Sequence, residues 1–459
     1  MTPSWLDYQL SVSAAHAAVV HAGTAWTYAQ LGRSIELWQR RLAGHGISRG
    51  ELVAFVGDHS PSTCALLFAL TRNGNVCVPF SRAAAPRLAE HCRIAAVDSL
   101  FELDREGAPW RRLEKPAGPA PHPLLATLRA TGRAGLVLFS SGSTGASKAS
   151  LLDLERLMGR FAEPRRPFVT LGFLLVDHIG GLNTLLSVLS SGGCLVSAAG
   201  ERSPEAVCAA IERHRVQLLP TTPTFLRMLL ISQAFRSYDL SSLELITYGT
   251  EPMPESTLRE LHESFPAVRL KQTYGLTELG ILSTRSADSG SLWVQVGGAG
   301  YETKIVDGVL WIRSQTAMLG YLNAPSPFDR DGWFNTQDAV EVKGDQLRIL
   351  GRTSELINVG GEKVYPAQVE CVLLELPNVL EATAWGKPSP VTGQVVAATL
   401  RLAVPEERTA LLARLQEHCR GRLPAYQVPV FLELAGAPVH NERFKKIRAQ
   451  AAAAPAGGA

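Results

Sequence analysis

Several features that would place this chain in a specialised class of protein are absent or scarce. Its seven cysteines are scattered and never form a Cys-x-x-Cys pair, so we expect reduced thiols, no structural zinc and a cytoplasmic location. The net charge is only +3, which predicts neither a nucleic-acid partner nor an anionic membrane surface. No basic region followed by an apolar core opens the chain, and no uncharged apolar run is long enough to span a membrane.

What the sequence does contain is the composition of an ordinary globular protein. Apolar residues make up 46% and charged residues 19% of the 459 positions. A chain of this length exceeds one simple core, so two or more domains are expected. Residues 451–459 are Ala, Pro and Gly only, and they are predicted to form a disordered tail.

Strand and helix patterns alternate up to about residue 275. The apolar run Leu52–Val56, for example, is followed by the helical pattern Ser60–Ala69 and by a second apolar run, Val76–Phe80. Such alternation predicts a mainly parallel sheet with helices on both faces, in which ligands bind at the carboxyl ends of the strands. From about residue 290 the pattern becomes that of hairpins, with turns at Asp307-Gly308 and Gly344-Asp345.

A further change follows Arg352. Pro366–Leu376 and Arg408–Leu423 have helical patterns, with two strand patterns between them. We therefore predict an α/β fold with two domains. The N-terminal domain, residues 1–351, has mainly parallel sheets flanked by helices and a small antiparallel β subdomain, and the C-terminal domain, residues 352–450, is α+β.

One short segment carries the strongest chemical signal. The apolar run Leu136–Phe139 predicts a buried strand, and it leads directly into Ser-Ser-Gly-Ser-Thr-Gly-Ala-Ser-Lys. Gly142 and Gly145 allow the backbone to approach an anion closely, and Lys148 adds a positive charge. The loop also offers four hydroxyl donors, which are Ser140, Ser141, Ser143 and Thr144. The segment therefore predicts a cradle for a polyphosphate.

The spacing of this loop excludes two commoner motifs. A Walker loop needs Gly-Lys-Ser/Thr, but here Lys148 follows Ser147 and precedes Ala149. The Gly-x-Ser-x-Gly elbow of hydrolases fails because the glycines flank a Ser-Thr pair. The structural alternative is a Ser/Gly-rich linker.

Two further motifs follow along the chain. In Tyr274-Gly275-Leu276-Thr277-Glu278, the tyrosine is suited to stack on a base, Thr277 to donate to a phosphate and Glu278 to bind Mg²⁺. Asp338 is suited to accept hydrogen bonds from two ribose hydroxyls, and Arg352 follows it. Taken singly, these residues also fit an ordinary turn, a surface aspartate and a hairpin exit.

In this order and at these intervals, the motifs resemble those of the adenylate-forming superfamily, which includes acyl-CoA synthetases, aryl-CoA ligases, peptide-synthetase adenylation domains and luciferases. The resemblance covers about residues 20–448. It implies an active site between the large N-terminal domain and a small, mobile C-terminal domain. It also implies ATP, Mg²⁺ and a small-molecule carboxylic acid. The acid attacks the α-phosphate to give an acyl-adenylate and pyrophosphate, and the thiol of CoA or of a carrier-protein phosphopantetheine then displaces AMP.

The resemblance also assigns roles to residues. The loop 140–148 would hold the β- and γ-phosphates, Thr277 would contact the α-phosphate, and Glu278 would bind Mg²⁺. Asp338 and Arg352 would hold the ribose hydroxyls. The adenine would be framed by Tyr274 and the turn Gly249-Thr250-Glu251-Pro252. The predicted cofactor-binding set is completed by Gly275, Gly361 and Lys363.

The catalytic lysine of this family lies near the C-terminus, where this chain has Lys445 and Lys446. Counting back from Arg448 favours Lys445, whose ammonium would stabilise the charge that develops between carboxylate and phosphate. His178 matches a histidine that often lines the acyl pocket, although a buried structural histidine fits equally well. Asp177 beside it leaves an amino-acid substrate open.

The sequence departs from the family pattern at several positions. These are Ser147 and Ala149 beside the loop lysine, Gln337 in place of the glycine of Thr-Gly-Asp, Ser354 at the hinge, Lys363 in place of an arginine, and Phe444 in place of the glycine before the catalytic lysine. The leading hypothesis is an acid–thiol ligase that makes an acyl- or aryl-CoA, as a monomer or homodimer. The alternatives are a stand-alone adenylation enzyme that loads an acyl carrier protein, and a degenerate, non-catalytic nucleotide-binding protein.

Overall fold

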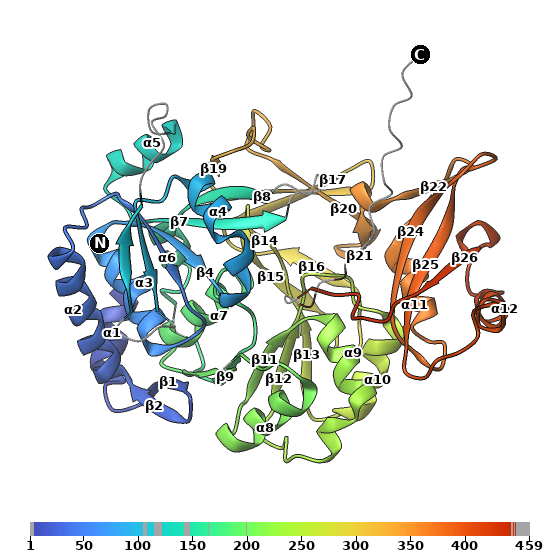
Figure 1. Ribbon diagram of the computed structural model, residues 1–459, viewed down its shortest axis with the longest axis horizontal. Helices are drawn as coiled ribbons and strands as arrows, with labels where there is room; N and C mark the ends of the chain where they lie inside the picture. The colour runs from blue at the N-terminus through green and yellow to red at the C-terminus, as the bar shows by residue number, and fades with distance from the viewer. Residues whose placement is uncertain are drawn as a thin grey trace.

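The structure is a computed structural model, and its described residues form four β-sheets with helices packed around them (Figure 1). The described residues are 4–103, 108–113, 122–141, 147–163, 165–198, 200–441, 444 and 446. The predicted tail, 451–459, lies outside them. Within these ranges no helix is both long and apolar enough to cross a membrane.

The first sheet is parallel apart from one edge strand, and it runs in the order β13-β12-β11-β9-β10-β1-β2. Its strands are β13 (Arg269–Gln272), β12 (Leu245–Tyr248), β11 (Leu218–Thr221), β9 (Val169–Gly172), β10 (Cys194–Ser197), β1 (Ala17–His21) and β2 (Thr24–Thr27). The non-sequential order reflects crossover connections through helices, as the alternating pattern predicts.

The second sheet runs in the order β19-β8-β7-β4-β3-β5-β6 and mixes parallel and antiparallel pairs. Its strands are β19 (Gly320–Tyr321), β8 (Ser147–Asp153), β7 (Gly135–Ser141), β4 (Val76–Phe80), β3 (Leu52–Val56), β5 (Ser99–Glu102) and β6 (Trp110–Arg112). The glycine-rich segment therefore joins two antiparallel neighbours, β7 and β8, and β7 continues the sheet through its parallel pairing with β4.

Helices cover the faces of these two sheets. In Figure 1, α1 to α5 lie with the blue and cyan strands, and α8 to α10 lie with the green strands below. The helices are α1 (Ser4–Val12), α2 (Tyr28–Gly44), α3 (Pro61–Asn73), α4 (Leu88–Ala95), α5 (Pro123–Thr131), α6 (Leu154–Gly159), α7 (Ile179–Ser190), α8 (Pro204–His214), α9 (Pro223–Ser232) and α10 (Glu255–Ser264). Hydroxyl N-caps start several of them, including Ser60, Ser203 and Thr222.

The third sheet is antiparallel and runs in the order β14-β15-β16-β21-β20-β18-β17. Its strands are β14 (Tyr274–Leu276), β15 (Gly280–Ser286), β16 (Val294–Gly297), β21 (Gln346–Arg352), β20 (Phe334–Lys343), β18 (Val309–Ser314) and β17 (Tyr301–Val306). Both hairpins expected from the Asp-Gly and Gly-Asp turns are confirmed. We refer to these three sheets and their helices as the N-terminal unit.

The fourth sheet, with α11 (Pro366–Leu373) and α12 (Arg408–Cys419), forms the C-terminal unit. Its strands are β23 (Glu362–Val364), β22 (Ile357–Val359), β25 (Gly393–Leu402), β24 (Val379–Ser389) and β26 (Phe431–Leu434). The unit has its own buried apolar cluster, in which α11 and α12 pack on the sheet. The predicted α/β class with an α+β C-terminal part is confirmed, whereas the predicted boundary at Arg352 stays a prediction.

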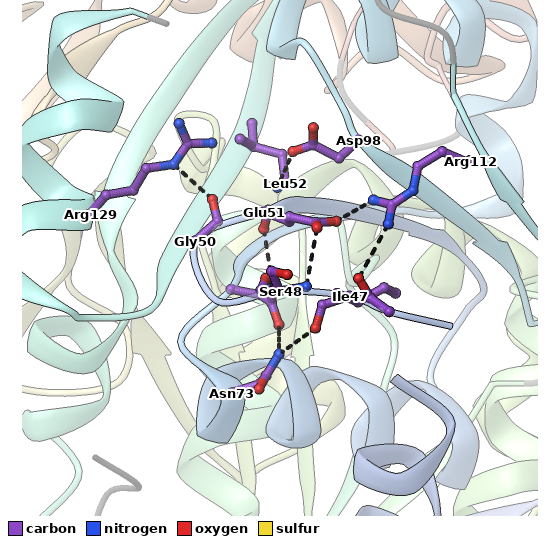
Figure 2. A network of polar contacts seen from close by, with 11 residues as sticks. Ile47, Ser48, Gly50, Glu51, Leu52, Asn73, Asp98, Arg112 and Arg129 are labelled. Atoms are coloured by element: carbon purple, nitrogen blue, oxygen red, sulfur yellow. Dashed lines mark hydrogen bonds and ion pairs between the residues drawn. The ribbon is translucent and has the colours of Figure 1, made fainter. Parts of the chain in front are cut away.

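Polar contacts around the turn 47–51, which precedes β3, connect this turn to β6 and α5 (Figure 2). Arg129 of α5 donates through Nε to the carbonyl of Gly50 at 2.9 Å, and Arg112 of β6 pairs with the carboxylate of Glu51. Because α5 leads into β7, this network helps to fix the strand that carries the glycine-rich segment. The seven cysteines, all within the described residues, are unpaired, as the sequence predicts.

The backbone of β20 is strained at Gln337, where φ is +60°. The side chain is exposed, and the backbone N–H donates to Oδ1 of Asn335 at 2.8 Å. A side chain in this left-handed region costs about 1–2 kcal/mol, a cost that glycine avoids. Gln337 therefore keeps a glycine-like conformation at the position where the family pattern has glycine.

We predict that Gln337→Gly raises the free energy of unfolding by about 0.5–1 kcal/mol, because relief of the strain exceeds the added entropy of the unfolded chain. Gln337→Val should lower it by about 1–2 kcal/mol, because a β-branched residue fits φ near +60° poorly. Urea denaturation measures both. Lys343→Gly, in the same strand but outside the positive-φ region, is the matched control and should destabilise; equal losses for the two glycine variants would contradict the prediction.

Candidate active site

A buried carboxylate joins three strands of the third sheet. Asp338 of β20 is only 6% exposed, and its Oδ2 accepts a hydrogen bond of 2.5 Å from the hydroxyl of Tyr274 on β14. Its Oδ1 lies 3.3 Å from Nε of Arg352, the residue paired with it on β21. The structure thus brings together three predicted site residues that are far apart in the sequence.

Burial raises the pKa of Asp338, and the facing Arg352 guanidinium and Tyr274 hydroxyl offset only part of this effect. Burial and the Asp338 charge also raise the pKa of Tyr274, so its hydroxyl stays protonated and remains a donor. The carboxylate is therefore fixed in position while being ionised less readily than a solvent-exposed aspartate.

A second buried carboxylate, Glu278, lies in the turn between β14 and β15. Its side chain accepts a hydrogen bond of 2.6 Å from the hydroxyl of Tyr321, and burial, with the Glu278 charge, raises the pKa of that tyrosine. Lys148 of β8 places its Nζ 5.3 Å from the centroid of the Tyr321 ring, a cation–π distance. Tyr321 therefore connects the lysine after the glycine-rich loop to the predicted metal ligand.

The two carboxylates share one electrostatic environment. The positive charge of Arg352 acts on Glu278 and on Tyr321 as well as on Asp338 and Tyr274. Of the two carboxylates, Asp338 contacts the Arg352 guanidinium directly, and Glu278 lies within its longer electrostatic range.

The ends of the β7–β8 hairpin are clamped by residues that the sequence did not single out. Asn323 donates through Nδ2 to the carbonyl of Ser147 at 2.8 Å and accepts from the N–H of Ala149 at 2.9 Å. His91 lies 3.0 Å from Oγ of Ser147 and stacks on Phe139, with ring centroids 4.0 Å apart. The flanks of the predicted phosphate loop are therefore held firmly, with Ser140 and Lys148 as paired neighbours.

Part of this predicted loop cannot be placed. Gly142, Ser143, Thr144 and Gly145 lie outside the described residues, as does the side chain of Ser141. Thr277 is described, and it lies half-buried in the turn between β14 and β15.

The turn after β12, residues 249–252, combines a tightly packed backbone with the acidic side chain of Glu251. A Cβ on Gly249 would lie 2.6 Å from the carbonyl oxygen of Thr273, so only glycine fits there, and Thr250 has φ of +75°. Glu251 accepts from the N–H of Thr224 at 2.7 Å, and burial raises its pKa. Pro252 follows it. Gly275 is equally crowded, because a Cβ there would lie 2.7 Å from the carbonyl oxygen of Gly280.

His178 caps α7 and lines a small pocket. Its Nδ1 accepts from the N–H of Gly180 at 3.2 Å. The pocket is lined by Phe173, Leu174, Leu175, His178, Arg202, Thr222 and Thr250. His178 therefore caps α7 and also lines the pocket. Asp177, in contrast, accepts a hydrogen bond of 2.8 Å from Ser81 and does not line this pocket.

The two C-terminal lysines differ in what the structure shows of them. Lys445 lies outside the described residues, whereas its neighbours Phe444 and Lys446 are placed. Nζ of Lys446 lies 2.8 Å from Oε2 of Glu370, whose side chain is 1% exposed. Lys446 is therefore engaged in an ion pair within the C-terminal unit.

Two predicted cofactor ligands lie apart from these clusters. Gly361 and Lys363 are exposed on the β22–β23 hairpin, which pairs with β25 through β22. Figure 1 shows β22 at the upper side of the C-terminal unit, away from β14. The structure does not bring this hairpin to Asp338 or Glu278.

Tyr321, Asn323 and His91 are the site residues that sequence reasoning missed. None lies in a glycine-rich or repeated pattern, and each acts through tertiary pairing: Tyr321 lies on β19, a strand of two residues. No local signal marks such a residue, because its role depends on which strand pairs with β8.

The site residues also fit the chemistry expected for magnesium. Among the described residues, no group of three or more His, Cys, Asp or Glu side chains is placed to hold a metal ion. Mg²⁺ is commonly bound by one or two carboxylates together with water and substrate phosphates, so a single carboxylate such as Glu278 fits this mode.

Comparisons with known proteins identify the family. A family described as AMP-binding enzyme matches residues 6–322, and one described as AMP-binding enzyme C-terminal domain matches residues 368–441. Indoleacetate–CoA ligase of Aromatoleum aromaticum is 29% identical over 490 residues, with 94% of each chain covered. Feruloyl-CoA synthase of an Amycolatopsis species is also 29% identical, over 476 residues, with 94% of each chain covered.

The fold is shared with solved structures. The crystal structure of the anthranilate CoA ligase AuaEII in complex with anthranoyl-AMP superposes with a TM-score of 0.80 at 22% identity, covering 95% of this chain and 93% of that one. The resemblance found in the motifs and the prediction of an acid–thiol ligase are confirmed. Since the first family match spans more than half of the sequence, the chain belongs to the AMP-binding enzyme family.

Proposed function

We propose that this protein activates an aromatic carboxylic acid with ATP, as its acyl-adenylate, and transfers the acyl group to the thiol of CoA. The observation that carries the proposal is the convergence of Asp338, Glu278 and Lys148 around Arg352 and Tyr321. The aromatic character follows from Phe173 and His178 in the pocket wall, and from the indole and phenylpropenoid acids named in the two relatives.

In this proposal the nucleotide lies across the third sheet. Asp338 accepts hydrogen bonds from the ribose hydroxyls, with Arg352 beside it, and the Gly249–Pro252 turn with Tyr274 and Gly275 frames the adenine. Lys148 and the loop 140–145 hold the β- and γ-phosphates, and Thr277 contacts the α-phosphate. Glu278 would hold Mg²⁺, which supplies positive charge against the phosphate oxygens when bound.

Two anions must meet in the first step. A carboxylate oxygen of the acid forms a bond to the α-phosphorus, the bond from that phosphorus to the bridging oxygen breaks, and pyrophosphate leaves with the electron pair. Lys445 supplies positive charge where negative charge develops, and His178 lies in the wall beside the acyl group. This role needs the C-terminal segment to reach the N-terminal unit, and Phe444 does so in the structure.

The second step forms the thioester. The thiolate of CoA attacks the acyl carbon, and AMP leaves as the acyl–phosphate bond breaks. Because the β22–β23 hairpin lies away from Asp338, we assign Gly361 and Lys363 to a second position of a mobile C-terminal unit. The residue range 352–450 is the proposed moving part.

Pyrophosphate release measured with ATP, Mg²⁺ and a panel of acids, with and without CoA, tests this function. We expect acid-dependent release with indole-, phenyl- or cinnamate-type acids, and thioester formation with CoA alone. If the thioester forms only with a phosphopantetheinylated carrier protein, the acceptor is that carrier protein and not CoA. No release with any acid would leave the non-catalytic alternative.

Asp338 gives a prediction about pH. Since its pKa is raised, we expect adenosine binding to weaken as the pH falls, by up to about tenfold per pH unit, with a midpoint above the value of about 4 of an ordinary aspartate. The sign follows because the ribose hydroxyls need the ionised carboxylate. Calorimetry with adenosine, which has no phosphates, measures this. 2′,3′-Dideoxyadenosine is the control; the same pH step with both nucleosides would rule out a ribose role for Asp338.

The two C-terminal lysines provide a matched pair of variants. Lys445→Ala should lower kcat for acid-dependent ATP–pyrophosphate exchange at least about 100-fold with little change in KM for ATP, because the lysine acts on the transition state. Lys446→Ala breaks the Glu370 ion pair, and it should cost stability more than rate. The reverse order of the two effects on kcat would transfer the catalytic role to Lys446.

A further inference from the structure

The segment that follows β26 is attached firmly to the C-terminal unit. Glu381 of β24 accepts from the N–H of Val439 at 2.9 Å, pairs with His440, and lies 2.9 Å from Nε of Arg401. Further along, the ion pair between Lys446 and the buried Glu370 of α11 holds the segment a second time. When the C-terminal unit moves, these residues must move with it.

Between these two attachments, the Phe444 ring enters the N-terminal unit. It is 8% exposed and belongs to the apolar cluster of the first sheet, with ring centroids 5.2 Å from Phe173 and 5.6 Å from Phe225. The guanidinium of Arg202 lies 5.3 Å from its centroid. Figure 1 shows the dark red segment reaching from the C-terminal unit toward α9, which carries Phe225.

The backbone at Phe444 is also engaged. Its carbonyl accepts a hydrogen bond of 3.5 Å from Oγ1 of Thr222, the N-cap of α9 and a wall residue of the His178 pocket. Its ring stacks on His440, with centroids 5.2 Å apart. The residue therefore contacts the wall of the pocket that also contains Thr250 and His178.

Phe444 holds this position in an unfavourable conformation. Its φ is +53°, in the left-handed region, where a non-glycine residue is disfavoured. Burial of the ring between two other aromatic rings favours the docked position and opposes this strain. An undocked Phe444 would lose that burial, so the ring favours the arrangement seen here.

We propose that Phe444 is a positioning residue that docks the C-terminal segment on the N-terminal unit and so presents Lys445 to the adenylation site. We call the ring with its partners Phe173, Phe225, Arg202 and Thr222 the Phe444 anchor. The inference rests on the proposed two-step function. It adds that the anchor favours the arrangement for adenylation and must be withdrawn before the β22–β23 hairpin can approach the site for thioester formation.

The anchor makes the two half-reactions respond in opposite directions. Removing the ring lowers the fraction of molecules in the docked arrangement, so adenylation slows in proportion. The thioester step, which needs the undocked arrangement, is not slowed and can become faster. A ring with a purely structural role would, if lost, depress both steps together.

The test compares Phe444→Ala and Phe444→Leu with the native protein in three assays. Acid-dependent ATP–pyrophosphate exchange reports the first step, and single-turnover thioester formation from synthetic acyl-adenylate and CoA reports the second. Trypsin cleavage at the basic residues around Phe444, followed by mass spectrometry without substrates, reports docking directly.

For Phe444→Ala we expect kcat of exchange to fall about tenfold or more, KM for ATP to change less than about twofold, and cleavage to accelerate about tenfold, with no loss in the thioester step. Phe444→Leu keeps apolar bulk and should be intermediate; it carries the test if the alanine variant does not fold. Phe235→Ala, which removes a half-buried ring packed at a tilt against Phe265 within the N-terminal unit, is the matched control and should leave cleavage unchanged.

Unchanged cleavage in both Phe444 variants, or equal slowing of both half-reactions, would overturn the anchor. Failure of the proposed function looks different. The native protein would then show no exchange with any acid, while the cleavage assay would still report whether Phe444 holds the segment.

Discussion

The contact between Asp338, Tyr274 and Arg352 is the constraint on which the rest of the site depends. A carboxylate that is 6% exposed is unfavourable unless it is paired and hydrogen-bonded, and here each of its oxygens has a partner on a different strand. The pairing fixes β14, β20 and β21 relative to one another. Glu278 lies within the longer electrostatic range of the same guanidinium.

The third sheet therefore brings residues that are distant in the sequence into contact. Tyr321 lies on the short strand β19, which pairs with β8. Its hydroxyl donates to Glu278, and its ring lies beside Lys148. Asn323 then fixes the backbone on both sides of Lys148. The lysine proposed to bind phosphate and the carboxylate proposed to bind Mg²⁺ both contact Tyr321 on this short strand, which limits how far either can shift.

The sequence predicted the secondary-structure elements and the residue types of the site better than it predicted which residues contact one another. Alternating patterns and Asp-Gly turns identify strands and helices because they depend on local periodicity, and Asp338, Glu278 and Lys148 stand out as charged residues beside strand ends or glycine-rich loops. The role of Tyr321 and the clamp at Asn323 depend on contacts between residues more than a hundred positions apart. No local pattern contains that information. Lys445 and residues 142–146 lie outside the described residues, so their roles stay predictions.

Two departures from the family pattern gain a common explanation in the structure. Gln337 and Phe444 both stand where the pattern has glycine, and both keep a positive φ, at +60° and +53°. Both residues therefore adopt a backbone conformation that glycine would adopt without strain. At Gln337 the side chain is exposed and gains no packing that would offset the strain. At Phe444 the side chain is buried between aromatic rings of the other unit. A non-glycine residue at positive φ thus leaves uncompensated strain at Gln337, whereas at Phe444 it makes an inter-unit contact.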